Sequence, residues 1–135
     1  MSEPRPISPP DRVTAPFWDA TRERRFVIQR CDACDAYQQY PRSFCISCEA
    51  NEPPFVEVSG RATIISFSIV HRAPHPAFTA PYAVALVRLD EGPVLLTNIV
   101  TDDLDALRCE QRVTLTWEAL DDGRALPMFT PEGKP

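Results

Sequence analysis

Residues 31–48 read CDACDAYQQYPRSFCISC and hold four of the five cysteines in the chain. Each Cys-x-x-Cys pair turns two sulfurs toward one point, and a short hairpin between the pairs can bring all four sulfurs together. The stretch therefore predicts a metal site formed by Cys31, Cys34, Cys45 and Cys48. Zinc is the expected metal, because tetrahedral thiolate sites hold zinc or iron and nothing in the chain indicates electron transfer. Four protein ligands leave no open coordination position, so we expect the zinc to be structural.

The two cysteine pairs depart from common metal knuckles at one position each. Such knuckles usually place glycine after the second cysteine, where backbone N–H groups point at sulfur. Here Asp35 and Glu49 occupy these positions. Two carboxylates beside a doubly negative tetrathiolate raise its negative potential, so we expect weaker metal binding than usual.

The cellular compartment favours metal binding over disulfides. The N-terminal MSEPRPISPPDR lacks the apolar segment of a secretory signal, so we expect a cytoplasmic protein. No run approaches the ~20 apolar residues of a membrane span. Thiols in the reducing cytoplasm stay reduced. A thioredoxin-like dithiol would need one pair at a helix N-terminus in a βαβ unit, which the sequence does not show.

Length and charge exclude several classes of protein. With 135 residues, the chain can form one sizeable core. The net charge is −5, and acidic residues outnumber basic ones in both halves. A general nucleic-acid-binding protein would show a basic face, so this balance argues against one.

The N-terminal part predicts an arm followed by a helix and the metal ribbon. Residues 1–13 are rich in proline and predict a flexible arm. The following TAPFWDATRERRF predicts a helix from Ala15 to about Arg25, with Thr14 as its N-cap. We assign the helix and the ribbon to one module, residues 14–54.

The remainder, residues 55–135, is rich in β-forming residues and predicts about five strands. Gly60 lies inside the first and longest run, where we expect a bulge or a sharp bend. The predicted order is a long strand at 55–72, a hairpin at 82–89 and 94–101, a helical turn at 101–107, and a hairpin ending near 126–129. This order predicts an OB-fold, a five-stranded barrel with a helix between its third and fourth strands. A β-sandwich would usually need about seven strands.

Several segments together resemble the DUF35 family over about residues 14–131. They are FW at 17–18, RC and DAC at 30–34, YPRSFC and ISC at 40–48, VSGRATIISFSIVH at 58–71, PYAVALVRLDEG at 81–92 and LPMFTP at 126–131. The resemblance implies a mainly β fold, with a short helix and a rubredoxin-like zinc ribbon before a five-stranded OB-fold barrel. The chain departs from the family pattern at Glu110, where a glycine usually precedes the fourth barrel strand.

The resemblance implies an accessory function. Members of the family pair with thiolase-fold enzymes in acyl-CoA condensation, thiolysis or side-chain aldol cleavage, and are described as acyl-CoA-binding. Some are encoded beside, or fused to, MaoC-like hydratase modules. We therefore expect a non-catalytic subunit that binds acyl-CoA and docks on a thiolase-fold enzyme.

Two further sets of candidate residues follow from this function. Cations should face the phosphates of CoA, and the candidates in or beside the barrel strands are Arg61, Arg72 and Arg88. His71 and Tyr82, near the same loop, are the other cofactor-binding candidates. The adjacent aromatic residues Phe17 and Trp18 are candidates for the partner interface.

Two alternatives from other classes remain open. An OB-fold with a zinc ribbon could bind single-stranded nucleic acid through Phe67, Phe78 and Tyr82. A stand-alone acyl-CoA hydrolase or thioesterase is the other alternative. Cys109 is the remaining cysteine, and we expect it to be an ordinary small buried or half-buried residue, because no histidine is near it in sequence. No recognisable catalytic motif is present.

Overall fold

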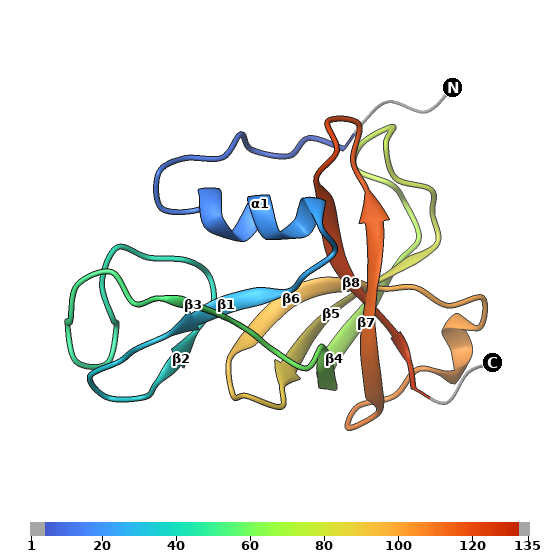
Figure 1. Cartoon of the computed structure of the whole chain (residues 1–135). Coiled ribbons are helices and arrows are strands. Elements are labelled where there is room, and N and C mark those ends of the chain that lie inside the picture. The colour runs from blue at the N-terminus through green and yellow to red at the C-terminus, as the bar shows by residue number, and fades with distance from the viewer. Residues whose placement is uncertain (1–4, 133–135) are drawn as a thin grey trace.

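The chain folds into a short helix, a three-stranded ribbon sheet and a closed five-stranded barrel (Figure 1). The computed structural model describes residues 5–132. The first four residues of the predicted arm and the last three of the predicted barrel domain lie outside this range. The mainly β fold predicted from the sequence is confirmed.

The helix α1 spans Ala15–Arg22 and ends earlier than predicted. Arg24 adopts a left-handed φ of 57°, which ends the helix before Arg25. Thr14 holds the N-cap position, but its side chain makes no capping hydrogen bond. The carboxylate of Asp11 instead accepts the backbone N–H of Thr14 at 2.8 Å, so the turn before the helix is fixed by Asp11.

The ribbon sheet contains three short strands in the order β2-β1-β3. They are β1 (Val27–Arg30), β2 (Tyr37–Gln38) and β3 (Phe55–Glu57). The prediction of one long strand over 55–72 is wrong, because β3 pairs with β1 whereas the chain after it enters the barrel. Gly60 lies at this change of sheet with a φ of 77°, which confirms the expected sharp bend.

The barrel closes in the order β4-β5-β6-β8-β7, with the 3-10 turn η1 between β6 and β7. Its elements are β4 (Arg61–Val70), β5 (Tyr82–Leu89), β6 (Val94–Ile99), η1 (Leu104–Ala106), β7 (Arg112–Ala119) and β8 (Ala125–Pro131). The bulge in β4 lies between Ile64 and Ser66. One parallel pairing, Ile99 with Phe129, joins β6 to β8 and closes the barrel.

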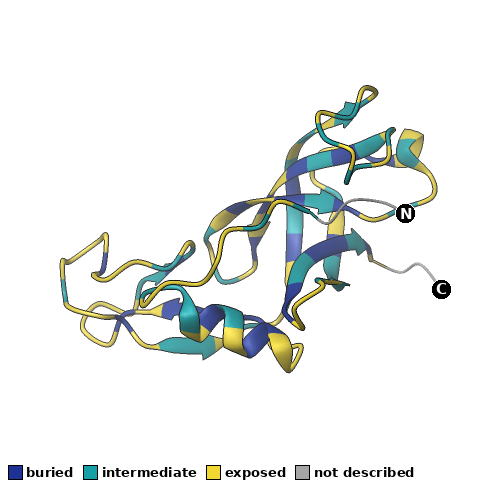
Figure 2. Ribbon diagram, turned by 90° about the horizontal axis from the view of Figure 1, so that it is seen from above, coloured by how far each residue is buried: buried dark blue, intermediate teal, exposed yellow. Residues whose placement is uncertain are grey.

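One hydrophobic core joins the helix, the ribbon and the barrel. The ring of Phe26, between α1 and β1, lies 6.4 Å from the rings of Phe17, Trp117 and Phe129, all edge-to-face. Phe26 is 2% exposed. Burial alternates along β5 and β6, whereas most of the ribbon loops are exposed (Figure 2). The ribbon module is therefore fixed to the barrel through shared packing rather than through the chain alone.

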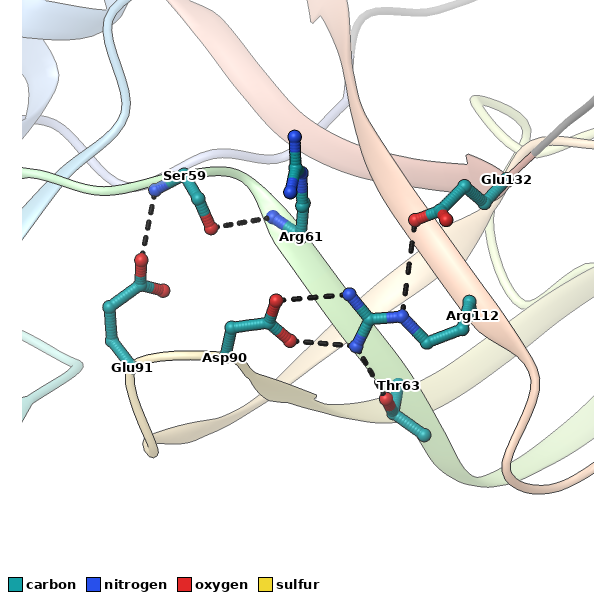
Figure 3. Close-up of polar contacts among 7 residues, drawn as sticks. All are labelled: Ser59, Arg61, Thr63, Asp90, Glu91, Arg112 and Glu132. Atoms are coloured by element: carbon teal, nitrogen blue, oxygen red, sulfur yellow. Dashed lines mark hydrogen bonds and ion pairs between the residues drawn. The ribbon is translucent and has the colours of Figure 1, made fainter.

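A polar network holds one end of the barrel together (Figure 3). Arg112 on β7 donates to both carboxylate oxygens of Asp90, at 2.7 and 2.9 Å, and to the hydroxyl of Thr63 at 3.0 Å. Its Nε lies 3.9 Å from Glu132. The hydrogen bonds from Arg112 hold the pKa of Asp90 below its usual value. The resulting stabilisation is present at neutral pH and is lost as pH falls through the lowered pKa.

Gly60 tests whether the bend between the two sheets constrains the fold. A Cβ added there would lie 2.8 Å from the Cβ of Leu115, at a positive φ. Gly60→Ala should lower the free energy of unfolding by about 3 kcal/mol, from backbone strain plus steric overlap. Gly92→Ala is the control, because Gly92 has a φ of 121° but no atom within 4 Å of the added Cβ. Denaturant unfolding of the two variants should show the larger loss for Gly60→Ala, and equal losses would contradict this account.

Candidate functional site

The four predicted cysteines converge at one end of the ribbon. Their Sγ atoms all lie within 4.8 Å of one another. The Sγ atoms of Cys31 and Cys48 are 3.6 Å apart, and those of Cys34 and Cys45 are 3.7 Å apart. Zinc–sulfur bonds of ~2.3 Å in a tetrahedron place the sulfurs about 3.8 Å apart. The donor set therefore fits one structural zinc ion, as predicted.

The two knuckles share one backbone pattern. In the first, the N–H of Asp35 donates to the carbonyl of Cys31 at 2.9 Å. In the second, the N–H of Glu49 donates to the carbonyl of Cys45 at 2.8 Å. The N–H of the second residue after each leading cysteine points at its sulfur, with a distance of 3.4 Å in both knuckles. Two equivalent turns thus present the four sulfurs to one point.

The positions where glycine was expected have the conformation that favours glycine. Asp35 has a φ of 63° and Glu49 a φ of 69°. Glu110, the third departure from the family pattern, has a φ of 68°. Side chains other than glycine are strained in this region. Asp35, Glu49 and Glu110 therefore lower stability at these turns relative to glycine.

The pKa values of Cys45 and Cys34 are shifted in opposite directions. The backbone N–H of Cys48 donates a hydrogen bond to the Cys45 sulfur and is the main cause that lowers the pKa of Cys45, to about 6. The backbone N–H of Ser47 acts in the same direction. At Cys34 the N–H of Ala36 also lowers the pKa, but desolvation and the neighbouring thiols together raise it to about 12. Each thiolate makes the next one harder to form. A divalent cation allows all four to ionise together, so metal binding is coupled to proton release.

Two buried glutamines support the ribbon loops, and the sequence analysis did not identify them. Gln29 exchanges hydrogen bonds with the backbone of Arg42, at 2.7 and 2.8 Å. Gln38 donates to Gln29 at 2.8 Å and to the carbonyl of Phe44 at 3.1 Å, and accepts the N–H of Ile46 at 3.0 Å. Gln29 lies in β1 and Gln38 in β2, the strands on either side of the first knuckle. An uncharged polar residue in a short strand beside the cysteines was the sequence signal that could have identified them.

Phe17 and Trp18, the predicted interface residues, both contact the core. Phe17 is 6% exposed, and the half-buried Trp18 packs beneath the guanidinium of Arg124, which lies 4.7 Å from the centre of a ring of Trp18. Both line an apolar pocket of about 240 Å³ where α1, the ribbon and the barrel meet. The other lining residues are Thr14, Phe26, Gln39, Tyr40, Pro41, Leu95, Leu96, Leu126 and Pro127.

The five predicted cofactor-binding residues fall into two groups at opposite ends of β4. Arg61 begins β4, and Arg88 lies across from the same end of the strand. His71 and Arg72 follow the last residue of β4, and Tyr82 pairs with that residue. Ten residues of extended strand span roughly 30 Å. The structure therefore does not bring all five residues into one site.

Tyr82 lies in an aromatic and cationic cluster. Its ring stacks on Phe78 with centroids 5.5 Å apart, and His75 packs edge-to-face on Phe78 at 6.1 Å. The guanidinium of Arg5 lies 4.7 Å from the centre of the Phe78 ring and pairs with Glu118. The sequence analysis missed Arg5, because it assigned the residue to a flexible arm.

A second hollow of about 240 Å³ opens beside this cluster. It is lined by Arg5, Phe78, Tyr82, Val84, Leu96, Thr97, Asn98, Leu126, Pro127 and Met128. Phe67, the third aromatic residue considered for nucleic-acid stacking, packs against the barrel core instead.

Cys109 is exposed in the loop before β7, so the expectation of a buried or half-buried residue is wrong. This loop meets β4 near the start of the strand. The N–H of Glu110 donates to the carbonyl of Ile64 at 2.8 Å. His71 lies beyond the opposite end of β4, about 20 Å along the strand from Ile64. Cys109 and His71 therefore do not form a catalytic pair.

None of the helices in residues 5–132 has the length and apolar content needed to cross a membrane.

Comparison with known proteins identifies the family. The family model described as the ChsH2 rubredoxin-like zinc ribbon domain matches residues 18–52, and the ChsH2 C-terminal OB-fold domain matches residues 55–118. A solved chain of the "Ltp2-ChsH2(DUF35) aldolase" is 38% identical, with a TM-score of 0.84, and the match covers 93% of this chain and 98% of that one. The chain belongs to the DUF35 family. A DUF35 domain-containing scaffold protein of Methanocaldococcus jannaschii is 30% identical over 67% of this chain and 66% of its own length.

Longer relatives contain a DUF35-like part. A probable enoyl-CoA hydratase alpha subunit of Thermomonospora curvata is 40% identical over 95% of this chain. A 3-oxo-4,17-pregnadiene-20-carboxyl-CoA hydratase alpha subunit of Mycobacterium tuberculosis is 38% identical over 65% of this chain. The matches span only 40% and 28% of these relatives, respectively.

The knuckle positions give a test of the metal site. Asp35→Gly and Glu49→Gly should each stabilise the zinc-loaded ribbon by about 1 kcal/mol, because glycine adopts a positive φ without strain. Asp32→Gly is the matched control, since it removes a neighbouring carboxylate at a position without a positive φ. Chelator competition should show tighter zinc binding in the first two variants only. An equal gain in Asp32→Gly would show that charge, and not conformation, limits zinc binding.

Proposed function

We propose that the chain is a non-catalytic accessory subunit that docks on a thiolase-fold enzyme and helps it to bind acyl-CoA. The observation that carries this proposal is the likeness to the DUF35 chain of the Ltp2-ChsH2(DUF35) aldolase, which extends over 98% of that chain. The likeness includes both the zinc ribbon and the barrel, so it concerns the whole architecture and not one common module.

The chemistry of the chain supports a non-catalytic role. Four cysteines complete the coordination of a zinc ion and leave no position for substrate or water. Cys109 and His71 lie at different ends of β4. A thiolase-fold partner would supply the catalytic cleft and its titratable groups.

The aromatic cluster around Tyr82 supports the acyl-CoA part of the proposal. The ring of Tyr82, which Phe78 supports from one side by stacking, could stack on an adenine ring, and the hollow beside it is largely apolar. Arg72 is exposed at the same end of the barrel as Tyr82 and has no ion pair within residues 5–132. A CoA phosphate could pair with this guanidinium.

The hydratase relatives support a second partner. Their names describe hydratase alpha subunits, and more than half of each lies outside the region that matches this chain. We propose that a MaoC-like hydratase module acts with this subunit and its thiolase-fold partner.

Co-expression tests the accessory role. The chain should co-purify with the thiolase-fold protein encoded nearest to its gene, and that enzyme should turn over acyl-CoA at least tenfold faster in the complex than alone. The purified chain alone should not turn over acyl-CoA. Full activity and solubility of the enzyme without this chain would contradict the proposal.

Titration of the complex with CoA tests the cofactor site separately. Tyr82→Ala should weaken CoA binding about tenfold, because it removes one stacked ring from the cluster. Arg61→Gln, at the opposite end of β4, should leave CoA binding unchanged and serves as the control. A larger loss of CoA affinity in Arg61→Gln than in Tyr82→Ala would contradict this assignment and would indicate a cofactor site at the other end of the barrel.

A further inference from the structure

The strands β5 and β6 are apolar on both faces. Their inner residues fill the barrel, as in any closed barrel. Most of their outer residues are also apolar: Leu86 lies opposite Leu96, and Val84 and Val94 flank this pair. Arg88 and Asn98 are the exceptions, with Arg88 opposite Val94 and Asn98 opposite Val84. Strands that are apolar on both faces are usually covered on both sides.

The other long strands of the barrel differ. The outer residues of β7 are Arg112, Thr114, Thr116 and Glu118, and those of β4 include Arg61, Thr63, Ser66 and Ser68. These strands show the alternation expected when one face meets solvent. The apolar outer face therefore distinguishes β5 and β6 from β4 and β7.

Four side chains of the β5–β6 face and one from the ribbon form a continuous surface, which we call the Leu96 patch: Val84, Leu86, Val94, Leu96 and Tyr40. The exposed fractions are 58% for Leu96, 51% for Tyr40, 39% for Val94 and 38% for Leu86. The Tyr40 hydroxyl accepts the backbone N–H of Leu96 at 2.9 Å, so the ribbon loop is held against β6. Contiguous exposed apolar surface of this kind marks interaction sites.

Apolar hollows border the patch on two sides. Leu96 lines both the pocket beside Phe17 and Trp18 and the hollow beside Tyr82. Each holds about 240 Å³, enough for one large side chain. The first contains no carboxylate, ammonium or guanidinium group, so it suits an uncharged apolar anchor.

The charged side chain that strand pairing places beside the patch is a cation. Arg88 is on the outer face of β5, across from Val94. Arg88 is exposed and forms no ion pair within residues 5–132. The complementary surface is therefore apolar, with carboxylates at the part of its rim that faces Arg88. A second copy of the chain would bring a second Arg88 to the same border.

We propose that the Leu96 patch is the docking surface for a partner protein that presents an apolar face with an uncharged anchor side chain and an acidic rim. This inference rests on the proposed function, because it assigns the surface that the thiolase-fold partner occupies. The ribbon contributes Tyr40 and the barrel contributes the other four residues, so the surface exists only while the two modules keep their relative position.

Binding of the zinc-loaded chain to its thiolase-fold partner, measured by biolayer interferometry without CoA, tests the apolar part. Leu96→Ser should weaken binding at least tenfold, and the double variant Leu86→Ser with Leu96→Ser about a hundredfold. Ile46→Ser is the matched control, because Ile46 is 57% exposed but lies on the second knuckle. It should change affinity less than twofold. Circular dichroism and zinc content should be unchanged in the Leu96 variants, because these side chains are exposed.

Charge reversal tests the rim. Arg88→Glu should weaken binding about tenfold at low salt and reduce the salt dependence of association, whereas Arg108→Glu, at an exposed position in the loop before β7, should change neither. If the wild-type chain binds its partner and the Leu96 and Arg88 variants bind equally well, the docking surface is wrong and the proposed function stands. If the wild-type chain does not bind, both are overturned.

Discussion

The convergence of four thiolates on one metal ion is the constraint on which the ribbon depends. Its strands are very short, and β2 has only two residues. Sheets of this size bury too little apolar surface to hold their shape alone. The two knuckles and the buried pair Gln29 and Gln38 hold the loops around the cysteines. Metal binding at such a site contributes directly to folding free energy.

The ribbon matters to the rest of the molecule because it is fixed to the barrel. Phe26 packs against rings from the helix and from two barrel strands, and Tyr40 bonds to the backbone of β6. These contacts place ribbon and barrel residues on one continuous surface. A closed metal site with no chemistry of its own can therefore affect function through the position of the surface that it supports.

The sequence predicted the features that depend on local patterns. Cysteine spacing identified all four ligands, and alternating apolar residues identified the barrel strands and their order. Asp35 and Glu49 were recognised because a local turn there favours glycine. The change of sheet at Gly60 was missed, because tertiary contacts decide which strand pairs with Phe55–Glu57. For the same reason, sequence could not show that Arg61 and Tyr82 lie at opposite ends of the barrel.

Hydrogen exchange of the zinc-loaded chain and of Cys45→Ser, combined with partner binding, tests the central claim most directly. Loss of the metal should remove protection from amides of β1, β2 and the two knuckles, while β4, β5 and β7 keep theirs, and binding to the proposed thiolase-fold partner should be lost. Retention of ribbon protection and of partner binding in a chain without bound metal would contradict the claim that the thiolate site holds the docking surface in place.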